Sequence, residues 1–177
     1  EDMLIYAQQQ SPRLSYMADF ISREILIDQA SITTDQDVFL HYDGAKINYS
    51  PQRLTESEFF LPPVDLLFDD DIKPQSIECF RWNGKKAFYA TQGGDVPFDI
   101  LSAIFFLISR YEEYLPHEKD AYGRFSHTAS LAYREGFLDE PLVNEWLVCW
   151  QGLLEAKFPR VLFRRKSFAF MPTYDID

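Results

Sequence analysis

The chain has 177 residues, 46% of them hydrophobic, so it is long and apolar enough for one folded domain with a buried core. Its 17 basic and 28 acidic residues give a formal net charge of −11, which disfavours nucleic acid and anionic lipid as partners. The longest apolar run, residues 100–108, is far shorter than the roughly 20 residues of a membrane-spanning helix. No basic-then-apolar leader opens the chain, which favours a cytoplasmic location.

The first third of the sequence predicts alternating strands and helices. Residues 3–7 form a short apolar run typical of a strand, and Ser11-Pro12 then predicts a helix with Ser as N-cap and Pro at the first helical position. The helix is expected to face the core with Leu14, Met17, Ala18, Ile21 and Ile25. Weaker patterns predict further elements: strands at 27–33, 46–49 and 59–61, and a helical turn at 35–40. This order favours an α/β domain.

A β-hairpin is predicted at residues 77–90. Two β-rich runs flank Asn83-Gly84, the residue pair that best tolerates the positive φ of a tight hairpin turn. We expect Trp82 to lie opposite Lys85, and Phe80 opposite Ala87. Because a hairpin is antiparallel, it favours a mixed arrangement of strands over a purely parallel sheet.

Two longer helices follow. Asp99 is expected to cap a buried helix that ends at Leu115, before Pro116. A second helix is predicted at 140–157. Its apolar face comprises Leu142, Val143, Trp146, Leu147, Trp150, Leu153 and Leu154. The predicted fold is therefore α/β, with α+β as the alternative: a single domain with a mixed sheet, a β-hairpin and about three main helices.

The usual motifs of metal and nucleophilic chemistry are missing from the sequence. His41, His117 and His127 form no HxxH or HxxxH pair, and there is no GxSxG elbow and no P-loop. Cys79 and Cys149 form no CxxC and are expected to be buried free thiols. We therefore expect no cofactor in this chain by itself.

Two weaker features leave alternatives open. Arg110, Glu112 and Glu113 lie at the end of the predicted buried helix, where ion pairing is the simplest interpretation and a hydrolase or nuclease site the alternative. With Arg124, they are candidates for a surface or interdomain cluster. The aromatic content of 16% is expected to fill the core, with sugar stacking as the alternative.

The end of the sequence carries the strongest chemical pattern. Residues 168–177 predict a strand, in which Asp175 and Asp177 point to the same face. Two carboxylates side by side can hold a divalent cation and act as a base. No neighbour follows them to complete a site, so we interpret the chain as the front portion of a longer enzyme.

The segment Phe168–Asp177 resembles the first catalytic motif of polysaccharide deacetylases (the NodB-homology, carbohydrate esterase family four group), a strand that ends in Thr-Phe/Tyr-Asp-Asp or an Asp-x-Asp variant. Upstream segments resemble the N-terminal region of Bacteroidetes-type deacetylase-like proteins: Ser11–Leu14, Pro97–Ile100, Ser109–Tyr114, Gly123–Phe125 and Ser130–Tyr133. The resemblance implies that Asp175 is the general base and Asp177 a ligand of a metal, commonly zinc. It also implies a histidine pair of the HxxxH type, which this chain lacks, so the site is incomplete here.

We therefore expect residues 1–166 to form a non-catalytic accessory domain, and residues 167–177 to be the first strand of a downstream deacetylase-like domain. That domain is the expected partner, and a saccharide is a further candidate. The alternatives are an independent glycan- or protein-binding module and, less favoured, a stand-alone hydrolase or nuclease.

Overall fold

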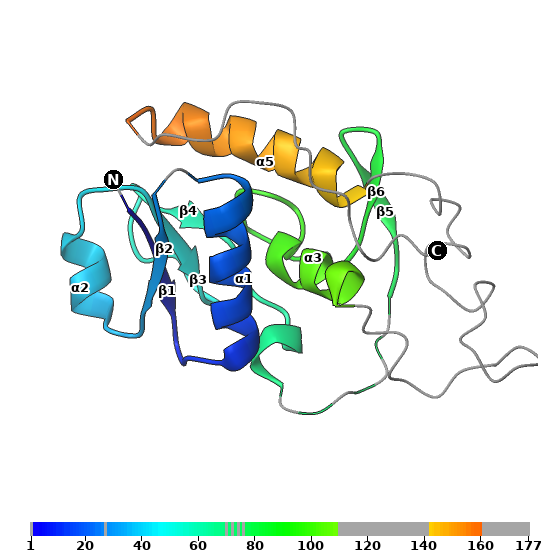
Figure 1. Ribbon diagram of the computed structural model, residues 1–177, viewed down its shortest axis with the longest axis horizontal. Helices are drawn as coiled ribbons and strands as arrows, with labels where there is room; N and C mark the ends of the chain where they lie inside the picture. The colour runs from blue at the N-terminus through cyan, green and yellow to red at the C-terminus, as the bar shows by residue number, and fades with distance from the viewer. Residues whose placement is uncertain are drawn as a thin grey trace, which may run out of the picture.

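In the computed structural model, strands and helices alternate along the first part of the chain, as the sequence predicts (Figure 1). The structure describes residues 2–26, 28–69, 71, 73, 75, 77–109 and 142–160. The strands are β1 (Met3–Ala7), β2 (Ala30–Thr33), β3 (Lys46–Tyr49), β4 (Phe59–Phe60), β5 (Phe80–Trp82) and β6 (Lys85–Ala87). The helices are α1 (Pro12–Glu24), α2 (Gln36–His41), the 3₁₀ turn η1 (Leu66–Phe68), α3 (Ile100–Ile108) and α5 (Leu142–Lys157).

The main sheet has four parallel strands in the order β2-β1-β3-β4. Ile5 of β1 lies opposite Ile32 of β2 on one side and Ile47 of β3 on the other. The chain moves outward from β1 to β2 and then returns past β1 to β3. The strand order therefore reverses between β1 and β3, as in doubly wound α/β folds.

Helices cover both faces of this sheet, α1 on one side and α2 on the other (Figure 1). All five residues of β1 are buried, as expected for a central parallel strand. Met3, Ile5 and Ala7 belong to the main core on the α1 side. Leu4 and Tyr6 point the opposite way and pack with Phe39 of α2, whose ring centroid lies 5.6 Å from that of Tyr6. Successive side chains of β1 therefore point alternately into the two hydrophobic cores, one on each face of the sheet.

The start and the buried face of α1 are as predicted. Ser11 has extended backbone angles, and its Oγ accepts the Leu14 N–H at 3.0 Å, while Pro12 occupies the first helical position. The predicted apolar residues are all buried: Leu14, Met17, Ala18, Ile21 and Ile25.

The predicted hairpin is also present in the expected register. Trp82 pairs with Lys85, and Phe80 pairs with Ala87. Asn83 and Gly84 have φ values of 52° and 79°, the left-handed conformation that the turn requires. The α/β class is confirmed, and the parallel and antiparallel pairings lie in separate sheets: β5 and β6 pair only with each other among the described residues.

The last two helices pack beside the hairpin and the sheet. Asp99 caps α3 as predicted, with its Oδ1 accepting the Ser102 N–H at 3.0 Å. α3 ends at Ile108, where Ser109 is the C-cap, and the predicted end at Leu115 lies outside the described residues. In α5 the predicted apolar face is buried except for Leu153, which is 40% exposed and was wrongly placed on that face. None of the described helices is long and apolar enough to cross a bilayer.

Candidate functional site

Open parallel sheets bind ligands beyond the carboxyl ends of their strands, where the strand order reverses. Here that place lies between β1 and β3, next to the N-terminal end of α1. The chain's own turn η1 packs there: Ser11 Oγ donates to the Leu67 carbonyl at 2.5 Å, and the Arg13 guanidinium donates to the Leu66 carbonyl at 2.7 Å. The rings of Tyr49 and Phe68 lie 5.8 Å apart. The usual ligand position is thus lined with contacts between segments of this chain.

A buried carboxylate, Asp99, connects three segments behind this edge. Its Oδ2 accepts hydrogen bonds from the Tyr49 hydroxyl at 2.6 Å, the Ser102 hydroxyl at 2.8 Å and the Val64 N–H at 2.9 Å. Asp99, Tyr49 and Ser102 are each 0% exposed. One side chain therefore fastens β3, the segment before η1 and the first turn of α3 to one another.

Burial governs the protonation of this cluster. Burial raises the pKa of the Asp99 carboxyl from its usual value, against the opposing effect of the hydrogen bonds from Tyr49, Ser102 and Val64. Burial first, and then the Asp99 charge, raise the pKa of the Tyr49 hydroxyl well above its usual value. The hydroxyl therefore stays protonated and available as a donor at neutral pH.

A second buried carboxylate, Glu58, organises the loop between β3 and β4. It accepts the N–H groups of Leu54 and Thr55 at 3.2–3.3 Å and the side-chain amide of Asn48 at 3.1 Å. Asn48 and Glu58 are both 0% exposed. Ser50 completes the cluster by donating to the Asn48 amide oxygen at 2.5 Å. These donors compensate the burial of the carboxylate.

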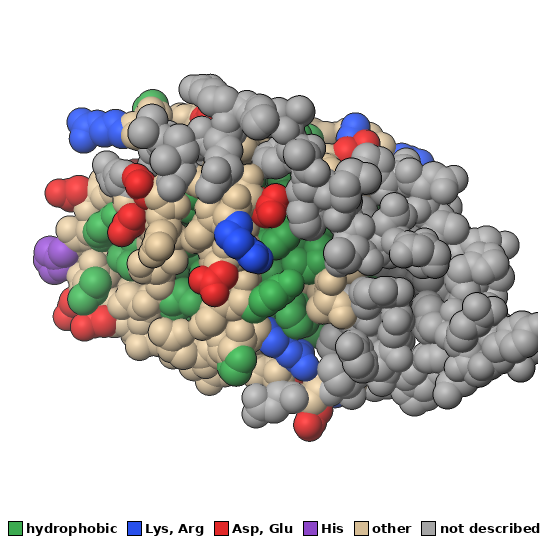
Figure 2. Space-filling view, in the orientation of Figure 1, with side chains coloured by type: hydrophobic (Ala, Val, Ile, Leu, Met, Phe, Trp, Pro, Cys, Tyr) green, Lys and Arg blue, Asp and Glu red, His purple; other side chains and the backbone are tan. Residues whose placement is uncertain are grey.

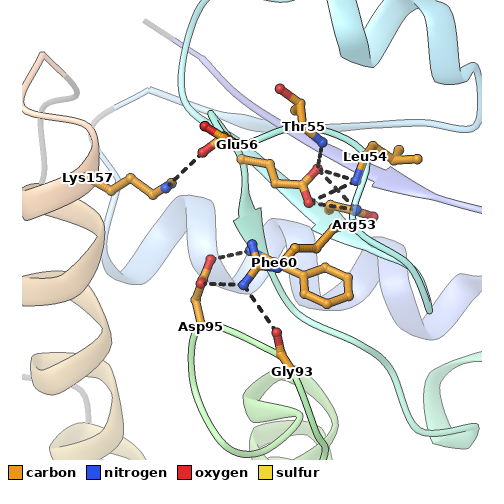
Figure 3. A network of polar contacts seen from close by, with 10 residues as sticks. Arg53, Leu54, Thr55, Glu56, Phe60, Gly93, Asp95 and Lys157 are labelled. Carbon is orange, nitrogen blue, oxygen red and sulfur yellow. Dashed lines mark hydrogen bonds and ion pairs between the residues drawn. The ribbon is translucent and has the colours of Figure 1, made fainter.

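The loops around β4 form the polar network seen in Figure 3. Asp95 bonds the Arg53 guanidinium at 3.0 Å and accepts the Phe60 N–H at 2.7 Å. Arg53 also donates to the Gly93 carbonyl at 3.2 Å and stacks 4.8 Å above the Phe60 ring centroid. At the other end of the network, Lys157 of α5 donates to the Glu56 carbonyl at 3.2 Å.

Lys46 is a buried cation on the α2 side of the sheet. Its Nζ donates to the carbonyls of Phe39 and Leu40, at 2.9 and 3.3 Å, and lies 5.0 Å from the Phe39 ring centroid. Carbonyls at a helix C-terminus carry partial negative charge, so they suit an ammonium group. Burial lowers the pKa of Lys46, opposed by the nearby charges of Glu58 and Asp43.

These buried polar groups are suited to holding segments together. Asp99, Glu58 and Lys46 are at most 2% exposed, and each is bonded within the domain. No group of three or more His, Cys, Asp or Glu residues in the described part of the chain is arranged to hold a metal ion. On the face shown in Figure 2, acidic and basic side chains are scattered over the described surface without forming one large patch.

The sequence-predicted site residues are not tested by this geometry. Arg110, Glu112, Glu113, Arg124, Asp175 and Asp177 all lie outside the described residues, as do His117 and His127. His41 is exposed, and its Nδ1 lies 2.8 Å from the Asp37 carbonyl. Cys79 and Cys149 are free thiols, as expected, but they are half-buried where the sequence analysis expected them to be buried.

The aromatic residues behave mainly as core. Trp146 packs against Phe88 and Phe98, with ring centroids 5.6 and 5.3 Å away, and Phe59 packs against Trp150. Tyr16, at 43%, is the one exposed aromatic side chain in the part of the chain that the structure describes. Most described aromatic side chains therefore fill the core, as expected.

The sequence analysis did not identify the Tyr49–Asp99 and Asn48–Glu58 pairs. Asp99 was noted only as a helix cap. One available signal was the alternation of Lys46 and Asn48, which puts two polar side chains on one face of the strand predicted at 46–49, with Ser50 directly after it. A polar row on a strand covered on both faces requires buried partners.

A family model described as "Family of unknown function (DUF7033)" matches residues 3–159. No curated protein and no solved structure matches the chain.

Proposed function

The chain belongs to the DUF7033 family, and on the basis of its own residues we propose that it is the non-catalytic N-terminal accessory domain of a metal-dependent carbohydrate deacetylase-like protein. The observation that carries the proposal is the segment Thr173-Tyr174-Asp175-Ile176-Asp177, which resembles the first catalytic motif of polysaccharide deacetylases. This motif lies beyond the family match, which ends at residue 159. The boundary predicted at residue 166 lies just after that point.

The described domain supports a scaffolding role. Its buried ionisable groups bond to neighbouring segments: Asp99 to β3 and α3, Glu58 to its own loop, and Lys46 to the end of α2. The edge where open parallel sheets bind ligands is packed by η1. In this proposal the downstream domain carries out the reaction. The accessory domain, residues 1–166, orients the downstream domain or covers its active site.

The metal belongs to the downstream domain in this proposal. Asp177 would be one ligand, with Asp175 as the general base, and the remaining ligands would be histidines after Asp177. A divalent cation there would supply Lewis-acid activation of an acetamide carbonyl and of water.

The test uses the protein extended through the downstream domain. Acetate release from an N-acetylglucosamine oligosaccharide and metal content are measured for the unmodified protein and for Asp175→Asn, Asp177→Asn and the control Asp71→Asn, an exposed residue. We expect Asp175→Asn and Asp177→Asn to lower the rate about 100-fold or more, and Asp177→Asn also to lower metal content. The control should match the unmodified protein.

Two results would overturn the proposal. One is acetate release by the 177-residue chain alone. The other is full activity in Asp175→Asn and Asp177→Asn, which would show that the motif is not part of the reaction centre.

A further inference from the structure

The four-stranded sheet ends on one side at β2, and no described strand pairs with the outer side of β2. Met3 donates its N–H to the Gln29 carbonyl at 2.9 Å, so β1 bonds the main-chain groups of Gln29 and of every second residue after it. The main-chain groups of Ala30 and Ile32 therefore point outward. Ser22 Oγ accepts the Ala30 N–H at 2.9 Å, and the Ala30 carbonyl and both groups of Ile32 remain at the edge.

The edge of β2 is lined by small, uncharged side chains. Ser31 is exposed, and Ala30, Ile32 and Thr33 are half-buried. β2 lies between α2 and α1 in Figure 1, and in Figure 2 the surface between these helices is mainly tan, the colour of backbone and uncharged polar side chains. Edge strands that stay unpaired commonly carry lysine or proline. β2 has neither, so its edge can accept another strand.

An outward row of N–H and carbonyl groups selects an extended peptide main chain as its partner. A second copy of β2, running antiparallel, supplies one. In the register centred on Ile32, the opposite pairs are Ile32–Ile32, Ser31–Thr33, Ala30–Thr34 and Gln29–Asp35. Each Ile32 then exchanges its N–H and carbonyl with those of the other copy, no two like charges meet, and Ser–Thr pairs across strands are favourable. The edge of β2 is therefore complementary to itself.

The opposite edge of the sheet limits how many copies can join. At β4, Asp95 already bonds both main-chain groups of Phe60. Among the described strands of this sheet, β2 is therefore the one with an open edge. When both molecules use the same self-complementary surface, the contact is isologous, and the assembly closes at two copies.

Helix α2 adds apolar surface beside this edge. It packs against β1 and β2, and its Val38 and Leu40 are 50% and 39% exposed. Because they flank the buried Phe39, which packs on the sheet, they project from opposite sides of α2, one of them on the side of β2. Antiparallel pairing about a two-fold axis leaves both α2 helices on the same face of the joined sheet. The apolar side chain on the side of β2 can then lose exposed surface against the second copy.

We propose that the chain forms a two-fold dimer through antiparallel pairing of β2 with β2 of a second copy, which joins the two sheets into one. This inference goes beyond the proposed function and does not depend on it. Strands of four residues bury little surface, so the dimer dissociates on dilution.

The first test uses the unmodified full-length protein. Its mass in solution is measured by sedimentation at concentrations up to about 1 mM, and amide hydrogen exchange at Ile32 is measured at both ends of that range. We expect an equilibrium between monomer and dimer, with exchange at Ile32 slowed about tenfold or more at the higher concentration. Exchange at Thr33, whose N–H faces β1, should change little with concentration.

Paired substitutions in the same protein test the register. Ser31→Asp with Thr33→Asp places like charges opposite each other in the dimer, whereas Ser31→Lys with Thr33→Asp places opposite charges there. We expect the first pair to raise the dissociation constant about tenfold or more, and the second to leave it within about threefold. Gln52→Asp with Gln92→Asp adds two charges at exposed loop positions as the control and should leave the dimer unchanged. Circular dichroism checks that each variant is folded.

Four results would overturn the inference. They are a monomer at every concentration, assemblies larger than a dimer, equal effects of the two charge pairs, and slow exchange at Ile32 in dilute protein. The last result would show that another part of the same chain pairs with β2. Because the mass and the exchange of the unmodified protein need no substitution, they decide the matter if a variant fails to fold.

Discussion

The hydroxyl of Tyr49 donates a 2.6 Å hydrogen bond to the carboxylate of Asp99, which lies 50 residues farther along the chain, and both side chains are fully buried. The bond joins the central sheet to the first turn of α3. Because the Asp99 oxygen that receives it also accepts from Val64 and Ser102, the loss of one donor affects a shared acceptor.

Tyr49→Phe should therefore destabilise the domain by about 1–3 kcal/mol, because it removes a donor to a buried carboxylate and leaves the ring in place. Urea unfolding followed by circular dichroism measures this change. Tyr42→Phe is the matched control: the Tyr42 hydroxyl donates to the Asp2 carbonyl at an exposed site, so the change should stay within about 0.5 kcal/mol. Equal losses in the two variants would contradict the role assigned to the Tyr49 bond.

The stability difference between the unmodified chain and Asp99→Asn should depend on pH. Burial raises the pKa of Asp99 in the folded state above the ordinary value of 3.8, so the folded chain holds this proton more tightly than the unfolded chain. The resulting contribution to the free energy of unfolding is fully present below pH 3.8 and is lost as the pH rises through the higher folded-state pKa. The free energy of unfolding of the unmodified chain, relative to that of Asp99→Asn, should therefore be highest at low pH.

Urea unfolding at pH steps from about 3 to 7 measures this dependence, in a range where asparagine does not titrate. If the unmodified chain instead gained stability over Asp99→Asn with rising pH, the hydrogen bonds to the carboxylate would outweigh the effect of burial, and the assigned direction would be wrong.

Glu58→Gln should destabilise the domain by about 1–3 kcal/mol, because an amide offers one acceptor oxygen where the carboxylate uses both. The neighbouring Glu56→Gln is a matched control, since Glu56 is exposed and contributes its backbone carbonyl to the contact with Lys157. Thermal unfolding of the two variants compares them. A destabilisation as large in Glu56→Gln would show that charge alone, rather than the Glu58 hydrogen bonds, stabilises the loop.

The two buried tryptophans of α5 should respond differently to phenylalanine. Trp146 Nε1 donates to the Lys86 carbonyl at 2.9 Å, whereas Trp150 Nε1 has no hydrogen-bond partner in the part of the chain that the structure describes. Both substitutions remove similar ring volume, so Trp146→Phe should cost about 1 kcal/mol more than Trp150→Phe. Chemical unfolding of both variants checks the difference. The reverse order would indicate that the Trp146 bond adds no net stability.

Local signals made much of the fold predictable. Ser11-Pro12 determines the start of α1, and Asn83-Gly84 determines the hairpin turn and its register, because each depends on a few adjacent residues. The Ser109 C-cap of α3 was not predicted, because the apolar pattern of the sequence continues past it without a Gly or Pro to mark an end. Leu153 was misassigned because its position borders the buried arc of α5, where periodicity alone does not decide burial.

The polar clusters could not be predicted in the same way. In the sequence, Tyr49 has the pattern of an ordinary strand residue and Asp99 that of an ordinary helix cap. The two become neighbours only because β3 and α3 pack together in the fold. The same holds for Asp95 and Phe60, which are 35 residues apart. The proposed reaction centre was inferred from a resemblance over the last ten residues and lies outside the described residues.

The contact between Asp95 and β4 also bears on self-association. Asp95 donates its N–H to the Phe60 carbonyl at 2.9 Å and accepts the Phe60 N–H through its side chain, so the outward main-chain groups of this strand are already satisfied. A strand from another molecule therefore cannot pair with the N–H and carbonyl of Phe60 at this edge of the sheet. Fibre growth by strand addition requires two sheet edges with unpaired main-chain groups. Because Asp95 occupies the edge at β4, this short aromatic strand is protected from templating aggregation.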